Sequence, residues 1–181
     1  MASKQGEYMQ DPLRLRRWRW PILATTGAVG LAALMLSGCA VGGEACTLKG
    51  TANFSPGLAV SKRAVSYTFS GTLSGCHAAS GDATIKGGTV NASGSGASVG
   101  CTGGGTAGTA TINWSNGQTS TLSFTTSGAL NAVAVTGTVT GGEFTGHSVH
   151  AVLAFTVSSP TACNTATGVT SATFTGETTP A

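Results

Sequence analysis

Five cysteines are the residues with the plainest chemical potential in this chain of 181 residues. A thiol can bind a metal, attack a substrate or form a disulfide, and the spacing of the cysteines separates these uses. No two of them stand in a Cys-x-x-Cys pair, the spacing typical of zinc knuckles and thioredoxin-type redox sites. The sequence therefore favours disulfide formation or covalent modification of these thiols: Cys39, Cys46, Cys76, Cys101 and Cys163.

A serine between two histidines is the second candidate for chemistry. Residues 146–150 read Gly-His-Ser-Val-His, which resembles the Gly-x-Ser-x-Gly nucleophile elbow of the α/β-hydrolases. That elbow needs a strand, a sharp turn and a helix, whereas both flanks here alternate as strands do. His147 and His150 are three apart, which in a strand places them on opposite faces. We expect no catalytic residue, no cofactor and no metal, with a hydrolase built on Ser148, His147 and Glu143 as the least favoured alternative.

Residues 1–38 have the three parts of a secretory signal peptide. The n-region, residues 1–20, carries four arginines, and the h-region, residues 21–36, is an uncharged run of 16 residues. This run is shorter than the roughly 20 residues with which a helix crosses a bilayer. We therefore expect a helical signal peptide that is exported and cleaved. The start of translation can be Met1 or Met9, because Met9 lies closer to the arginines.

The sequence Leu36-Ser37-Gly38-Cys39 closes the apolar run and resembles the lipobox of bacterial lipoproteins. The resemblance implies cleavage before Cys39 and a diacylglycerol on its thiol. It also implies that the partner is the cell membrane, with residues 39–45 as a short linker on the extracytoplasmic face. Ordinary cleavage after Ala40 or Ala45, which would give a secreted protein, stays open.

With Cys39 lipidated, four cysteines remain, an even number suited to two disulfides outside the cytoplasm. Cys46 opens the first expected strand and Cys76 closes the second, so a hairpin brings them together. Cys101 then pairs with Cys163 by elimination. The alternation of side chains puts Cys76 out of phase by one residue, which a bulge at Gly75 would correct. Four cysteines allow three pairings, and the other two stay open.

The charge of the mature part argues against nucleic acid as a partner. The net charge of +3 belongs to the leader, because residues 39–181 contain four basic and four acidic residues. Binding to phosphate backbones needs clustered Lys and Arg. Nothing in the composition names a protein or small-molecule partner, and we expect a monomer.

Alternation of apolar and polar residues predicts one all-β domain over residues 46–181. Val65, Tyr67 and Phe69 alternate with Ser and Thr, and no helical period follows the leader. Short loops require antiparallel pairing. We favour a β-sandwich of about nine strands over a flattened up-and-down β-barrel, and pairing of the last strand with the first would decide for the barrel. The expected strands are residues 48–54, 65–74, 83–91, 97–101, 110–114, 122–124, 132–140, 147–157 and 168–177.

The mature part is similar in style to small exported all-β domains of high-GC Gram-positive bacteria. The similarity rests on an early Cys, a Gly-rich middle, the segment Val139-Thr140-Gly141-Gly142-Glu143-Phe144 and a late Cys before a Thr-rich strand. It implies no activity. We expect a structural or binding module at the cell envelope, and as an alternative a carrier whose barrel encloses a small apolar ligand. Trp114, in phase with Ile112, is expected in the core rather than on a sugar-binding face.

Overall fold

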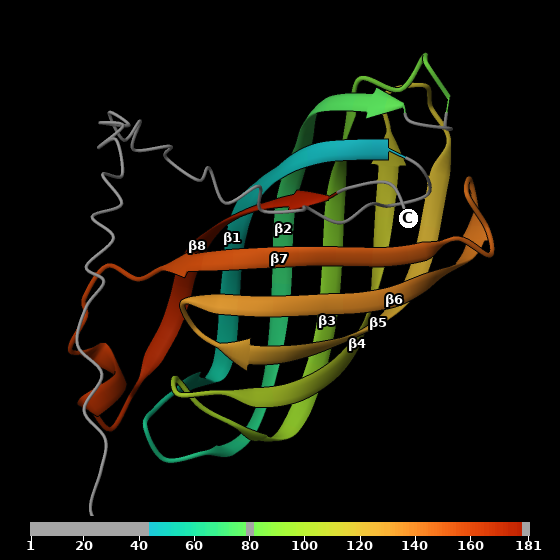
Figure 1. Ribbon diagram of the computed structural model, residues 1–181. Coiled ribbons are helices and arrows are strands. Elements are labelled where there is room, and N and C mark those ends of the chain that lie inside the picture. The colour runs from blue at the N-terminus through green and yellow to red at the C-terminus, as the bar shows by residue number, and fades with distance from the viewer. Residues whose placement is uncertain (1–43, 79–81, 179–181) are drawn as a thin grey trace, which may run out of the picture. The chain divides into compact units, whose positions relative to one another are not determined.

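Eight antiparallel strands make up most of the described chain, residues 44–78 and 82–178, in a computed structural model (Figure 1). The predicted signal peptide, Cys39 and the part of the predicted linker up to residue 43 lie outside the described residues. A single turn of 3-10 helix, Ala162–Asn164, precedes the last strand. The strands are β1 Glu44–Leu58, β2 Arg63–Ala78, β3 Gly87–Val99, β4 Gly104–Trp114, β5 Thr119–Ala129, β6 Ala132–Gly142, β7 Ser148–Thr156 and β8 Val169–Thr178.

The first and last strands pair with each other, so the sheet closes into a barrel. Leu48 pairs with Gly176 and Ala52 with Ala172 across this seam, while every other strand pairs with its neighbours in sequence. The antiparallel all-β fold is confirmed as the up-and-down barrel, and the favoured sandwich is wrong. Closure explains the difference, since it leaves neither β1 nor β8 with an unpaired edge.

The barrel has eight strands rather than nine, because two expected strands belong to one. Strand β3 runs unbroken from Gly87 to Val99 and joins the segments predicted at 83–91 and 97–101. Its inward positions include Gly94 and Gly96, so the large apolar residues that mark a buried face are missing from this stretch. The alternation therefore fades in the sequence although the strand continues.

Strand β1 also outlasts its predicted end at Ser55-Pro56-Gly57 and continues to Leu58. Its pairing with β8 is interrupted between Asn53 and Leu58. Pro56 lies in this interruption, where the hydrogen bond that proline cannot donate is not required. The strand therefore passes through a sequence that is typical of a turn.

Phenyl rings packed against glycines fill the middle of the barrel. Phe124 is flanked in register by Gly108 on β4 and Gly137 on β6, and a Cβ added at Gly108 would lie 2.9 Å from its Cζ. Phe174 likewise packs against Gly50, where a Cβ would lie 2.8 Å from its Cζ. The missing glycine side chains make room for rings that would otherwise not fit inside eight strands.

A disulfide lies at each end of the barrel. Cys46–Cys76 is at the end where β1 begins and β8 finishes, which we call the terminal end. Gly75, with φ 59°, forms a bulge opposite Cys46 that brings Cys76 into phase. At the opposite, far end, Cys101–Cys163 joins the β3–β4 loop to the β7–β8 loop. The structure thus pairs the cysteines as predicted, and the bulge at Gly75 is the device that makes the first pair possible.

The far end also depends on one arginine. The Arg63 guanidinium donates to the carbonyl oxygen of Gly57 and, at 3.3 Å, to that of Thr167. Backbone hydrogen bonds add Cys101 to Ala59 at 2.8 Å and Val60 to Cys163 at 3.0 Å. Three loops are therefore joined around the Cys101–Cys163 disulfide.

We expect Gly108→Ala to lower the free energy of unfolding by about 1–3 kcal/mol, because the new methyl group would be overpacked against the Ser93 carbonyl oxygen and the Phe124 ring. Gly105→Ala on the same strand is the matched control: its Cβ would have no heavy-atom neighbour closer than 3.7 Å. Urea unfolding of both variants measures the difference. Equal losses in the two variants would show that the interior has room to spare.

Replacing Cys101 and Cys163 together by Ser should lower the free energy of unfolding by about 4 kcal/mol on the chain-entropy model, since this bridge joins residues 62 apart in the sequence and so closes a long loop. Urea unfolding of the double variant under oxidising conditions checks this. Non-reducing peptide mapping of the wild type is the companion measurement, and a peptide linking Cys46 to Cys101 or to Cys163 would contradict the pairing.

Candidate functional site

The interior of the barrel contains two small cavities rather than one ligand pocket. The larger, about 70 Å³, is lined by apolar side chains and Thr178, and the smaller, about 50 Å³, lies nearer the far end. Phe69 borders both and packs against Phe155 and Phe174, with ring centroids 5.9 and 5.4 Å away. Drug-sized ligands occupy pockets of about 300–1,000 Å³. The interior is therefore a core that leaves little free space.

Three hydroxyl groups inside the barrel bond to one another. Tyr67 Oη lies 2.7 Å from Thr106 Oγ1, which lies 2.7 Å from Thr126 Oγ1. Burial raises the pKa of Tyr67, opposed by its hydrogen bond to Thr106. The phenol therefore stays protonated at neutral pH, and the chain of hydroxyls satisfies polar groups without supplying a nucleophile.

Trp114 belongs to the core, as its spacing predicts, and helps to close the terminal end. Its Nε1 donates to Ser120 Oγ at 2.8 Å, and Ser120 Oγ donates to the carbonyl oxygen of Glu143 at 2.6 Å. The ring of Phe144 meets Trp114 edge to face, 5.5 Å between centroids. The indole is 4% exposed, so it is not available to stack on a ligand.

Glu44 is the one buried carboxylate among the described residues. Its side chain is fully covered, and neither oxygen has a hydrogen-bond partner among these residues. Burial raises the pKa of Glu44, the charge of Asp82 adds to this, and Lys86 and His77 act in the opposite direction. Asp82 itself has a lowered pKa, because Thr84 hydrogen-bonds its carboxylate. Glu44 is therefore a titratable group at the terminal end that accepts no hydrogen bond from the described residues.

The residues of the candidate hydrolase do not assemble into a triad. Ser148 and His150 begin β7 and, two apart, lie on the outer face of the barrel, while His147 precedes the strand. Ser148 is exposed and opposite Thr138 in the pairing of β6 with β7. Glu143 lies in the β6–β7 turn at the same, terminal end, where its carbonyl oxygen accepts the Ser120 hydrogen bond. No group of three or more His, Cys, Asp or Glu in residues 44–78 and 82–178 is arranged to bind a metal ion.

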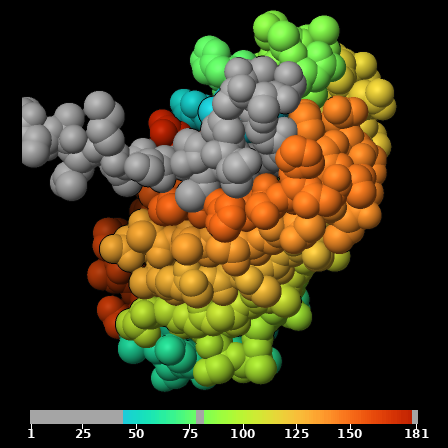
Figure 2. All heavy atoms as spheres, turned by 45° about the vertical axis from the view of Figure 1, so that its right-hand side comes forward, coloured from blue at the N-terminus to red at the C-terminus, as the bar shows by residue number. Residues whose placement is uncertain are grey.

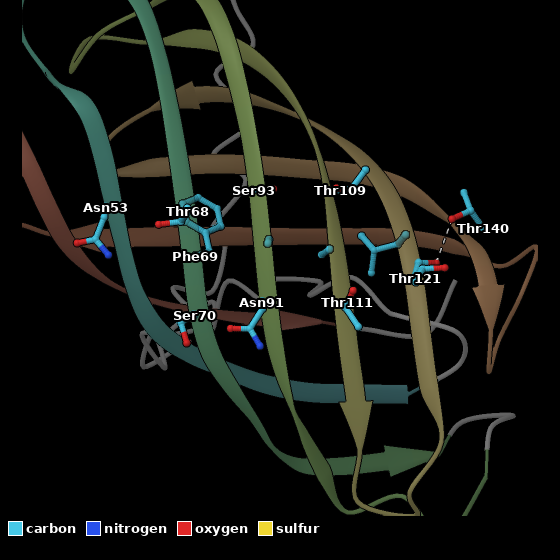
Figure 3. A pocket seen from close by; sticks show the side chains of 13 residues that line it. Asn53, Thr68, Phe69, Ser70, Asn91, Ser93, Thr109, Thr111, Thr121 and Thr140 are labelled. Carbon is cyan, nitrogen blue, oxygen red and sulfur yellow. Dashed lines mark hydrogen bonds between the residues drawn. The ribbon is translucent and has the colours of Figure 1, made fainter.

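A shallow groove of about 700 Å³ runs over the outside of the barrel from β1 to β6 (Figure 3). Its outward side chains are all Ser, Thr or Asn, and they form two rows across neighbouring strands. The first row is Asn53, Thr68, Ser93 and Thr109, each paired in register with the next. The second row is Ser70, Asn91, Thr111 and Thr121, paired in the same way.

This groove could not be predicted from the sequence. The polar positions of the strands show only that an outer face exists, since alternation does not say which strands are neighbours or in what register. The signal in the sequence is the restriction of these positions to Ser, Thr and Asn with no charged residue among them. Figure 2 shows another part of the outer wall, over β4 to β7, and a second shallow hollow of about 470 Å³ lies over β4 to β6.

No helix in the described ranges is long and apolar enough to cross a membrane.

Comparison with known proteins gives no relative: no protein-family model, curated protein or solved structure matches this chain.

We expect Glu44→Gln to make the protein more stable than the wild type at neutral pH and equally stable near pH 4. A raised pKa in the folded state means that folding favours the protonated acid, so the wild type loses stability as the pH rises from about 4.3, the ordinary pKa of Glu, through the raised value. The side-chain amide of the variant cannot ionise, so the variant escapes this loss. The urea concentrations at the midpoint of unfolding, compared between wild type and variant at about pH 4 and pH 7.5, measure this loss. A difference in midpoint that is the same at both pH values would refute the raised pKa of Glu44.

Proposed function

We propose that the chain is an exported lipoprotein whose barrel acts as a binding module at the outer face of the cell membrane. The observation that carries this proposal is the position of Leu36-Ser37-Gly38-Cys39 immediately ahead of a disulfide-bonded barrel. Disulfides persist in oxidising compartments outside the cytoplasm, where a cleaved and lipidated chain would be. The two features point to the same location from independent residues.

A lipid on Cys39 would also orient the barrel. Strand β1 begins at Glu44, five residues after Cys39, and five extended residues span at most about 17 Å. The terminal end of the barrel would then lie next to the membrane, with the far end pointing away. The outer wall between the two ends would remain accessible to other molecules of the envelope.

The groove on the outer wall favours binding over a purely structural role. The interior cavities of about 70 and 50 Å³ are small, which makes a carrier of an apolar ligand the weaker candidate. The groove has about ten times the volume of the larger cavity and is exposed to solvent. A module of this kind needs no catalytic residue, and we infer that the protein is not an enzyme.

The lipid anchor predicts a specific chemical product. Mass spectrometry of the membrane fraction should show a peptide that begins at Cys39 and carries a diacylglyceryl group. In a Cys39→Ala variant, lipidation and the cleavage that depends on it should both fail, so the uncut chain accumulates.

Two outcomes would contradict the anchor. One is recovery of the unmodified wild-type chain in the medium, beginning at Val41 or Cys46. The other is a Cys39→Ala variant that is cleaved and located as the wild type is.

A further inference from the structure

Seven of the nine outward side chains of the groove make no hydrogen bond to the residues that the structure describes. Elsewhere on the outer wall, hydroxyls bond to each other, as Thr125 and Thr136 do at 3.1 Å. The two exceptions are at the β5–β6 edge of the groove: Thr140 Oγ1 donates to the carbonyl oxygen of Thr121 at 3.3 Å (Figure 3), and Thr121 Oγ1 donates to that of Gly141 at 3.4 Å. Ser and Thr hydroxyls both donate and accept, and so does the Asn amide. The two rows therefore offer donors and acceptors to a ligand.

The chemistry of the lining excludes most classes of ligand. None of the thirteen residues is charged, in keeping with residues 39–181 as a whole, which contain four basic and four acidic residues. A nucleic acid or an acidic polymer would find no cation to neutralise it. The residues that dominate binding at protein interfaces are enriched in Trp, Tyr and Arg, and the outward positions in the groove supply none of these, which disfavours a protein partner. A neutral ligand with many hydrogen-bonding groups remains.

The geometry of the rows points to a linear polymer. Neighbouring strands lie about 4.8 Å apart and alternate residues of a strand about 6.7 Å apart. The rows thus form a regular grid of hydroxyl and amide groups that crosses five strands, β1 to β5, over about 19 Å. Each exposed hydrogen bond contributes little because it replaces one to water. Appreciable affinity therefore requires a ligand that repeats its contacts along the grid.

We propose that this groove binds a neutral polysaccharide, with the glycan chain lying across the strands between the first and second rows. A neutral polysaccharide presents hydroxyl groups along its whole length and no charge, which matches the lining. The proposal deepens the envelope binding role and rests on it for its biological setting. The groove itself is formed by the barrel, and its binding does not depend on whether Cys39 carries lipid.

Native affinity electrophoresis tests the groove with the full chain in a detergent that has no sugar headgroup. The gels contain mannan, arabinogalactan or a linear glucan, with dextran sulfate as the charged comparison. The groove variant is Thr68→Val/Thr109→Val/Thr111→Val. The matched control, Thr138→Val/Thr156→Val/Thr175→Val, makes the same exchange on exposed positions of β6, β7 and β8. Valine favours strands, so both variants keep the fold, and thermal unfolding verifies this.

We expect at least one neutral polysaccharide to retard the wild type and the control, and the groove variant to bind it at least about tenfold more weakly. Retardation should change little between about 0.05 and 0.5 M NaCl, since no ion pair is involved. The proposal is overturned if no neutral polysaccharide retards the wild type, if the two variants behave alike, or if dextran sulfate binds better and salt abolishes its binding. If the chain is lipidated but no neutral polysaccharide retards it, the proposal for the groove is refuted and the lipid anchor stands. If the chain binds a polysaccharide but carries no lipid, the lipid anchor alone is refuted.

Discussion

Packing of phenyl rings against glycines inside the barrel is the constraint on which the remaining structure depends. Phe124 lies between Gly108 and Gly137, and Phe174 lies against Gly50. An eight-stranded barrel has an interior just wide enough to be filled by side chains or to enclose one small ligand. Here the glycines let the rings occupy that space, so the barrel closes over a filled apolar core.

Because side chains fill the interior, we expect a ligand to bind on the outer wall of the barrel. The two ends are closed by disulfides and by local packing, with Trp114 and Ser120 at the terminal end and Arg63 at the far end. All four carboxylates of the described chain belong to the terminal end or the strand ends that reach it. The wall between the ends is left with neutral hydroxyl and amide groups, and there the groove lies.

Much of the fold could be predicted from local pattern. The alternation of apolar and polar residues predicts most of the strands. The hairpin of β1 with β2 brings Cys46 next to Cys76, and because Cys76 is one residue out of phase, a bulge is expected at Gly75, where it forms. Closure could not be predicted, because it depends on pairing between β1 and β8, which lie at opposite ends of the described chain. The middle of β3 could not be predicted as a strand, because its inward positions are glycines and carry no apolar side chain. The groove requires the register of five strands, which no local pattern contains.

The central claim is that the barrel is filled and works through its outer wall. Titration of the full chain with a fluorescent fatty acid tests it most directly, because a barrel with usable interior space would take up the probe. The account predicts no saturable binding to the interior, and no change on replacing Phe69, which borders both cavities, by Trp. Binding of one probe per chain that Phe69→Trp abolishes would contradict it and place the function inside the barrel.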